Sequence, residues 1–205
     1  MGIRKKISDK FSFVGKFDFW FISKILKIRR KQITIFLKII SRLGDWWSVT
    51  IFSLVILFVF NFDLGVLILL SLLVQTILQK VIKNIVLRRR PYIKHREKVK
   101  RLIVPPDRYS FPSGHTATAF VLFFSVSLFY WNLAIILLIF AILMGFSRVY
   151  LGVHYLTDVV FGILLGFVSV EITRLFYQTV SDILKQTILY QLHLQLYLKV
   201  HHVFG

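Results

Sequence analysis

The sequence predicts an all-α protein, a polytopic transmembrane helix bundle. Of its 205 residues, 57% are hydrophobic and only 18% are charged, and the mean hydropathy of +0.72 is too high for a soluble domain of this length. The charges are unevenly placed, so that uncharged runs of membrane-spanning length alternate with two basic segments. The sequence contains no cysteine, which excludes a disulfide framework, a zinc-thiolate site and a thiol nucleophile.

The net charge of +18 comes mainly from two segments of the chain. Residues 1–42 contain twelve Lys and Arg residues, residues 80–108 contain eleven, and only four lie elsewhere. In an apolar chain, such clustering indicates contact with anionic lipid headgroups at one membrane surface. We expect no nucleic-acid partner, because these basic residues flank apolar spans and lack an aromatic stacking platform in a soluble domain.

Residues 1–43 form the first predicted segment. Basic and apolar side chains alternate closely in it, and its uncharged stretches are too short to cross a bilayer. This pattern is typical of helices that lie in the headgroup layer, where Lys and Arg reach anionic lipids. We therefore expect basic interfacial helices at the N-terminus.

The second predicted segment, residues 44–176, is a membrane domain with five spans. Residues 109–147 contain no Lys, Arg, Asp or Glu and would extend about 58 Å as one helix, so they make two spans that turn near residues 130–132. Asp63 marks a hairpin between two shorter runs. The predicted spans are residues 46–62, 64–79, the two halves of 109–147, and 153–170.

Two further segments complete the expected organisation. Residues 177–205 alternate Leu with Gln, His and Lys, which predicts an amphipathic C-terminal helix. A sixth span would have to come from residues 11–43. By the positive-inside rule, we expect an integral protein of a bacterial inner (cytoplasmic) membrane with its N-terminus in the cytoplasm. Five spans place the polar face described below on the cytoplasmic side, and six would place it outside.

The first polar cluster is Lys83, Arg90 and Pro91, after the second predicted span. If the segment is helical, Lys83 and Arg90 are seven residues apart and lie on one face, so both cations point the same way. The alternative is an ordinary basic flank whose side chains reach the membrane interface.

The second polar cluster is Pro112, Ser113, Gly114 and His115, where the third predicted span begins. Free backbone N–H groups at a helix start bind anions, and Gly114 would let an oxyanion approach the backbone. The alternative is a plain helix cap followed by an interfacial histidine.

The third polar cluster is Ser147, Arg148, His154 and Asp158, between the fourth and fifth predicted spans. His154 and Asp158 are four residues apart, so on a helix they share a face. A carboxylate beside an imidazole fixes its tautomer and leaves the other nitrogen free to attack. Burying polar residues inside an apolar bundle costs free energy of folding. Their presence there therefore indicates a functional use.

The predicted hairpins bring all three clusters to one membrane face. There they would supply three cations, a helix N-terminus and two histidines. This set fits a pocket for a tetrahedral dianion, with one histidine to attack and the other to protonate the leaving group.

The three clusters also resemble the signature motifs of the type 2 phosphatidic acid phosphatase superfamily. The matching positions are Lys83-x6-Arg90-Pro91, Pro112-Ser113-Gly114-His115 and Ser147-Arg148-x5-His154-x3-Asp158, and the resemblance covers roughly residues 44–172. It implies a helical membrane phosphatase that acts on lipid phosphates, with a fold shared with soluble acid phosphatases and vanadium haloperoxidases.

The resemblance and the residues together imply a mechanism. His154 attacks phosphorus to give a phosphohistidine, Asp158 holds the histidine tautomer, and His115 acts as acid and then as base. No metal or other cofactor is expected. The residues expected to bind the phosphate are Lys83, Arg90, Ser113, Gly114 and Arg148.

Several alternatives stay open from the sequence. The same residues could form the oxyanion cage of a vanadate-dependent peroxidase, or the cations could serve a non-catalytic protein that binds anionic lipids. The candidate substrates are phosphatidylglycerophosphate, polyprenyl diphosphate, phosphatidate and lipid A phosphate. The sequence does not specify an oligomeric state.

Overall fold

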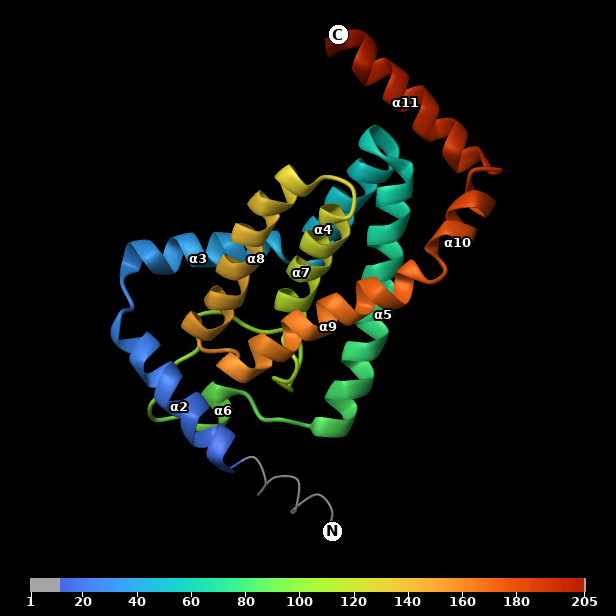
Figure 1. The fold of residues 1–205 in the computed structure, drawn as a ribbon. Coiled ribbons are helices and arrows are strands. Elements are labelled where there is room, and N and C mark those ends of the chain that lie inside the picture. Colours follow the sequence, from blue (N-terminus) through green and yellow to red (C-terminus); the bar gives the residue numbers. More distant parts are fainter. Residues whose placement is uncertain (1–11, 205) are drawn as a thin grey trace.

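The computed structural model describes residues 12–204, which form helices and connecting loops (Figure 1). Four basic residues of the predicted interfacial segment, Arg4, Lys5, Lys6 and Lys10, lie outside the described residues. The elements are α2 (Ser12–Lys27), α3 (Lys31–Leu43), α4 (Trp46–Val55), the π-helical turn η1 (Ile56–Phe60), α5 (Phe62–Val86), α6 (Pro91–Lys94), α7 (Gly114–Ser127), α8 (Trp131–Tyr150), α9 (Leu156–Arg174), α10 (Tyr177–Leu184) and α11 (Ile188–Phe204).

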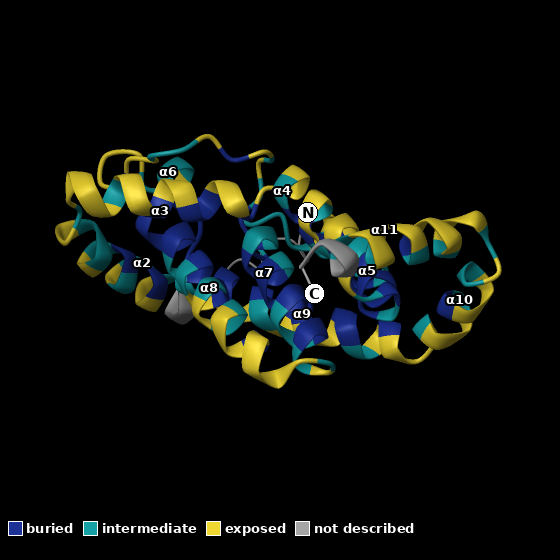
Figure 2. Cartoon of the chain, turned by 90° about the horizontal axis from the view of Figure 1, so that it is seen from above, coloured by how far each residue is buried: buried dark blue, intermediate teal, exposed yellow. Residues whose placement is uncertain are grey.

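Helix α7 lies at the centre of the bundle and packs against α5, α8 and α9. Buried residues lie on the inward sides of these helices, and apolar side chains are exposed on the outer sides (Figure 2). Gly162 and Gly166 of α9 allow this helix to cross α7 closely. A Cβ atom at Gly162 would lie 2.7 Å from the carbonyl oxygen of Ser113. This close approach holds the start of α7 against the start of α9.

The expected membrane-helix fold is confirmed, although fewer helices than five meet the length of a span. Among the described residues, α5, α8 and α9 are each long and apolar enough to cross a membrane. Helix α3 and the α4–η1 helix pass the same test only as a pair bent by 57°. Helix α7 is apolar but has only 14 residues. Residues 12–204 therefore contain three candidate spans, or four if the bent pair is one span.

The N-terminal helices pack against the rest of the bundle. Helices that only lie in the headgroup layer would not need such contacts. Helix α2 lies against α8 and α9, where Asp18 and Ile22 are fully buried, while Phe17 and Trp20 on its other side are exposed. Arg29 follows α2 and donates hydrogen bonds to the carbonyl oxygen of Tyr150. The interfacial placement of these helices is thus not confirmed, and α2 is a component of the bundle.

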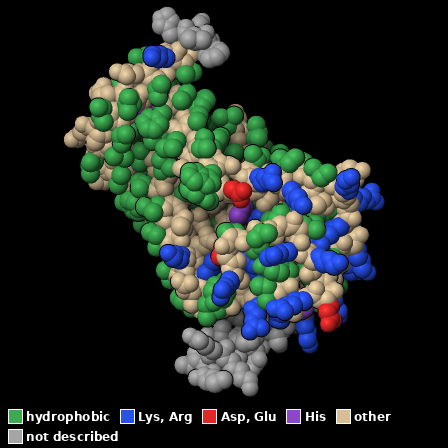
Figure 3. Space-filling model, turned by 180° about the vertical axis from the view of Figure 1, so that it is seen from behind, with side chains coloured by type: hydrophobic (Ala, Val, Ile, Leu, Met, Phe, Trp, Pro, Cys, Tyr) green, Lys and Arg blue, Asp and Glu red, His purple; other side chains and the backbone are tan. Residues whose placement is uncertain are grey.

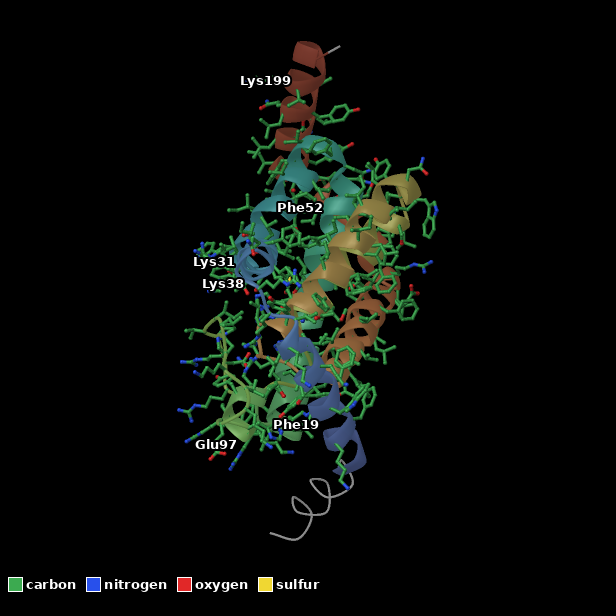
Figure 4. The ribbon with its side chains drawn as sticks, turned by 90° about the vertical axis from the view of Figure 1, so that its left-hand side faces the viewer. Phe19, Lys31, Lys38, Phe52, Glu97 and Lys199 are labelled. Carbon is green, nitrogen blue, oxygen red and sulfur yellow. The ribbon has the colours of Figure 1, made fainter. Side chains whose placement is uncertain are left out.

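Basic side chains gather over one half of the molecule, and hydrophobic side chains cover much of the other half (Figure 3). Lys38 on α3 and the loop that carries Glu97 lie on the same side of the protein, whereas Lys199 on α11 lies at the opposite end (Figure 4). The clustering of positive charge in sequence therefore becomes clustering in space.

Candidate active site

The three predicted clusters meet at one end of the bundle. They come from the end of α5, the starts of α6, α7 and α9, and the end of α8. The loop before α7 folds back beside Arg88, and the backbone N–H of Ser110 donates to the Arg88 carbonyl oxygen over 2.9 Å. This pairing brings the loop residue Asp107 next to the cations of the first cluster.

Lys83 and Arg90 converge, but they do not share a helix face as the sequence pattern suggested. Helix α5 ends at Val86, and Leu87 has the left-handed φ of 51°, so Arg90 lies beyond the helix as the N-cap of α6. Asp107 accepts hydrogen bonds from Lys83 Nζ at 2.6 Å and from Arg90 Nη2 at 2.8 Å. One carboxylate therefore bridges both cations and offsets half of their combined charge.

Arg148 lies at the end of α8 with only 1% of its surface exposed. Its Nη1 atom donates to the hydroxyl of Ser41 on α3. Its Nε atom is buried and has no hydrogen-bond partner among the described residues. A buried guanidinium donor without a partner is costly, and an incoming oxyanion would satisfy it.

His154 is buried between α8 and α9 and contacts both cationic and acidic groups. Its Nε2 atom lies 3.1 Å from Nη1 of Arg90. Because a guanidinium can only donate, Nε2 accepts, and the ring proton of the neutral tautomer resides on Nδ1. Burial, followed by the charges of Arg90 and Arg148, holds the pKa of His154 well below its ordinary value. The imidazole is therefore neutral at neutral pH.

Asp158 lies in the first turn of α9, whereas His154 precedes that helix. The two residues therefore do not share a helical face, although the chain still brings them together. Nδ1 of His154 is 3.6 Å from Oδ2 of Asp158, and a shift of about 0.6 Å would give a normal hydrogen bond of ~3.0 Å. Oδ2 also accepts from the backbone N–H of Tyr155 at 2.9 Å, which fixes the carboxylate at the helix start.

The second cluster forms the N-terminus of α7, with Ser113 as N-cap. The Ser113 hydroxyl lies 2.9 Å from that of Thr116, and its backbone N–H donates to the Asp158 carbonyl oxygen. The space at Gly114 holds the side-chain amide of Gln79, because a Cβ atom there would lie 2.4 Å from Nε2 of Gln79. The room that the sequence assigned to an oxyanion is thus occupied by an amide group in this structure.

His115 faces an open pocket of about 350 Å³. Its Nε2 atom lies 2.9 Å from Oδ1 of Asp45, a residue at the break between α3 and α4. Arg148 also lines the pocket, so the second and third clusters border the same space. The remaining lining residues are Lys38, Ser41, Arg42, Leu102, Ile103, Val104 and Pro106.

Sequence reasoning did not identify five residues that contact the predicted site. Four of them lie outside the motifs, where an isolated acid or serine gives no periodic signal, and the fifth, Arg88, lies at an unspecified position of the first motif, in a run of three arginines. Within the described residues, no group of three or more His, Cys, Asp or Glu side chains could hold a metal ion. The missed residues are Asp18, Ser41, Asp45, Arg88 and Asp107.

Known proteins resemble the chain in sequence and in structure. It is 33% identical over 147 residues to the undecaprenyl-diphosphatase of Sulfolobus acidocaldarius, an alignment that covers 67% of this chain and 68% of the relative. The crystal structure of Aquifex aeolicus LpxE matches with a TM-score of 0.69 and 29% identity, over 76% of this chain and 93% of that one.

A second solved structure gives the same fold. The PAP2-type phosphatidylglycerolphosphate phosphatase of Bacillus subtilis matches with a TM-score of 0.68 and 26% identity, over 87% of this chain and 94% of that one. Residues 64–182, which contain all three clusters, match the PAP2 superfamily. The chain therefore belongs to the PAP2 superfamily.

Proposed function

We propose that this protein is an integral-membrane phosphatase that hydrolyses a lipid phosphate monoester or diphosphate through a phosphohistidine intermediate. The observation that carries the proposal is a neutral, buried His154 whose Nε2 atom faces Arg90, beside a pocket lined by His115 and Arg148. Family membership and the names of the relatives support a lipid phosphate as the substrate.

In the first step, Nε2 of His154 attacks phosphorus. The P–N bond forms as the bond from phosphorus to the leaving oxygen breaks, and positive charge develops on the imidazole. Asp158, beside Nδ1, stabilises that charge and keeps the proton on Nδ1. The Arg90 donor that contacts Nε2 in the free enzyme then binds a phosphate oxygen instead.

Charge on the transferring phosphoryl group is balanced by Lys83, Arg90 and Arg148. All three are buried, so each interacts with the oxyanion in a medium of low dielectric constant, where charge stabilisation is strong. We place Ser113 and Gly114 at the edge of this cage, because the N-terminus of α7 carries a partial positive charge.

His115 donates the proton that the leaving oxygen needs. Asp45, 2.9 Å from its Nε2 atom, holds the ring at the pocket, and the negative charge of a bound phosphate stabilises the imidazolium that acts as the acid. In the second step, the neutral His115 takes a proton from water, and the resulting hydroxide attacks the phosphohistidine. Phosphate leaves, and both histidines return to their starting states.

The pocket fits the polar end of an amphiphile. Lys38 and Arg42 lie on its α3 wall, and the loop residues Leu102, Ile103 and Val104 provide an apolar wall. An anionic headgroup can contact the cations while its first methylene groups contact the loop. The basic surface around it also suits an anionic membrane.

We further propose five spans, with α4–η1 and α7 crossing the bilayer together with α5, α8 and α9. Helices α2 and α3 pack beside the candidate site, which supports an N-terminus on the same side as that site. The concentration of basic residues on this side supports a cytoplasmic location in a bacterial inner membrane.

Replacement of the reacting groups tests the mechanism. We expect His154→Ala to abolish phosphate release, and His115→Ala and Asp158→Asn to lower kcat by roughly 100-fold or more. The matched control is His193→Ala, because His193 packs against Phe62 and Tyr190 far from the site. Wild-type turnover in folded, purified His154→Ala protein would disprove the assigned nucleophile.

Asp107 competes with the substrate for two cations, which gives a second prediction. Asp107→Asn keeps the size of the side chain but removes its charge, so vanadate and phosphate should inhibit at severalfold lower concentrations. Glu97→Gln changes an exposed acid in the same loop and should leave inhibition unchanged. Unchanged or weaker inhibition of the Asp107→Asn enzyme would contradict this competition.

The substrate class can be tested in detergent micelles that contain EDTA. We expect phosphate release from at least one member of a panel of phosphatidylglycerophosphate, a polyprenyl diphosphate, phosphatidate and lipid A phosphate, because the cations rather than a metal stabilise the phosphoryl group. No release from any of these lipids would refute the proposed function. Loss of activity on chelation, restored by a divalent ion, would refute the metal-independent mechanism.

The orientation can be measured by cysteine labelling, because the chain has no cysteine of its own. Val104 lies in the exposed loop beside the pocket, and Asn132 lies in the exposed turn at the start of α8. With five spans and a cytoplasmic N-terminus, an impermeant maleimide added to intact cells should label Asn132→Cys and not Val104→Cys. The reverse pattern would mean an outward-facing site.

A further inference from the structure

Helix α2 contributes a fully buried carboxylate, Asp18, to the region beneath the candidate site. Its oxygens accept hydrogen bonds from the guanidinium of Arg88, from the Thr157 hydroxyl at 2.5 Å and from the Thr157 backbone N–H at 3.1 Å. Burial of a carboxylate is strongly destabilising unless it is paired in this way. Asp18 lies outside residues 64–182, the part of the chain that matches the superfamily.

Arg88 links Asp18 to the carboxylate beside the proposed nucleophile. One guanidinium nitrogen bonds Asp18, and another donates to Oδ1 of Asp158 at 2.6 Å. The guanidinium also lies over the Tyr155 ring, 4.3 Å from its centroid. Burial alone would lower the pKa of Arg88, but the two carboxylates outweigh that effect and raise it. The cation is therefore permanently shared between two acids.

Because Arg88 binds two carboxylates at once, it contacts only one oxygen of Asp158 and leaves the other to face His154. Oδ1 of Asp158 contacts Arg88, whereas Oδ2 remains 3.6 Å from Nδ1 of His154. A guanidinium with a single carboxylate partner prefers to bind both of its oxygens. Without the charge of Asp18, Arg88 would be free to do this, and it would draw Oδ2 away from the imidazole.

We propose that Asp18 is a positioning residue for catalysis, which acts through Arg88 to keep Asp158 aligned with His154. The inference rests on the proposed function, because it assigns α2 a role in the same reaction. Asp18 has no direct contact with His154 or with the residues that line the pocket among its described hydrogen bonds. Its loss should therefore reduce kcat and leave KM nearly unchanged.

A double-mutant cycle separates this role from a merely structural one. We expect Asp18→Asn to lower kcat by roughly 10- to 100-fold in the wild-type enzyme, and to cause no further loss in Asp158→Asn enzyme. Asp18→Glu, which keeps the charge, should recover part of the lost kcat. Lys16→Gln, a change at an exposed position of the same helix, is the matched control and should leave kcat unchanged.

Two results would overturn the inference. One is wild-type kcat in the folded Asp18→Asn enzyme. The other is a loss of the same size in both backgrounds, which would mean that Asp18 acts independently of Asp158. If wild-type protein releases no phosphate from any lipid, the proposed function fails instead, so the two failures are distinguishable.

Thr157 provides a second test if Asp18→Asn protein does not fold. The Thr157 hydroxyl donates to Asp18 and accepts from Arg88 at 2.7 Å, so it holds both members of the link. We expect Thr157→Ser to keep kcat within about twofold and Thr157→Val to lower it severalfold at constant KM. Equal kcat values for these two variants would overturn the inference.

Discussion

The pairing of a few buried cations with carboxylates is the interaction on which the rest of this structure depends. Asp18 and Asp158 share Arg88, and two cations of the proposed phosphate cage share Asp107. In an apolar bundle, each unpaired ion would cost several kcal/mol, so the pairs constrain how α2, the loop before α7 and the start of α9 can pack. The fold is thus tied to the site by electrostatics as well as by apolar contact.

The same constraint explains how a site for a dianion can exist before the substrate arrives. Lys83 and Arg90 repel each other at close range, and Asp107 bridges them and offsets part of their charge in the free enzyme. Arg148 is held differently, by a neutral serine hydroxyl, and its Nε donor has no partner in the part of the chain that the structure describes. In the proposed mechanism, a phosphate therefore exchanges with a carboxylate at two cations and binds directly at the third.

The sequence predicts the convergence of the motifs well, because the lengths of the apolar runs determine which helix ends meet. It does not predict how each motif achieves its local geometry. Arg90 reaches the site through a left-handed residue at Leu87, and a periodic pattern cannot signal such a break. Asp18 and Asp107 were not predicted for another reason: a lone acid in a basic segment has the same pattern whether it is exposed or fully buried.

Residues that precede the matched region also contact the candidate site, so residues 64–182 do not form its surroundings alone. Residues 64–182, the part of the chain that matches the superfamily, contain both histidines, Asp158 and the cations of the proposed site. The groups that touch this set from the preceding segment are Asp18 at Arg88, Ser41 at Arg148 and Asp45 at His115. Each binds a side chain that belongs to or adjoins a motif, and each comes from α2, α3 or the break after α3. The N-terminal helices therefore complete the polar surroundings of the candidate site, and under the proposed mechanism their sequence is constrained by catalysis as well as by packing in the bundle.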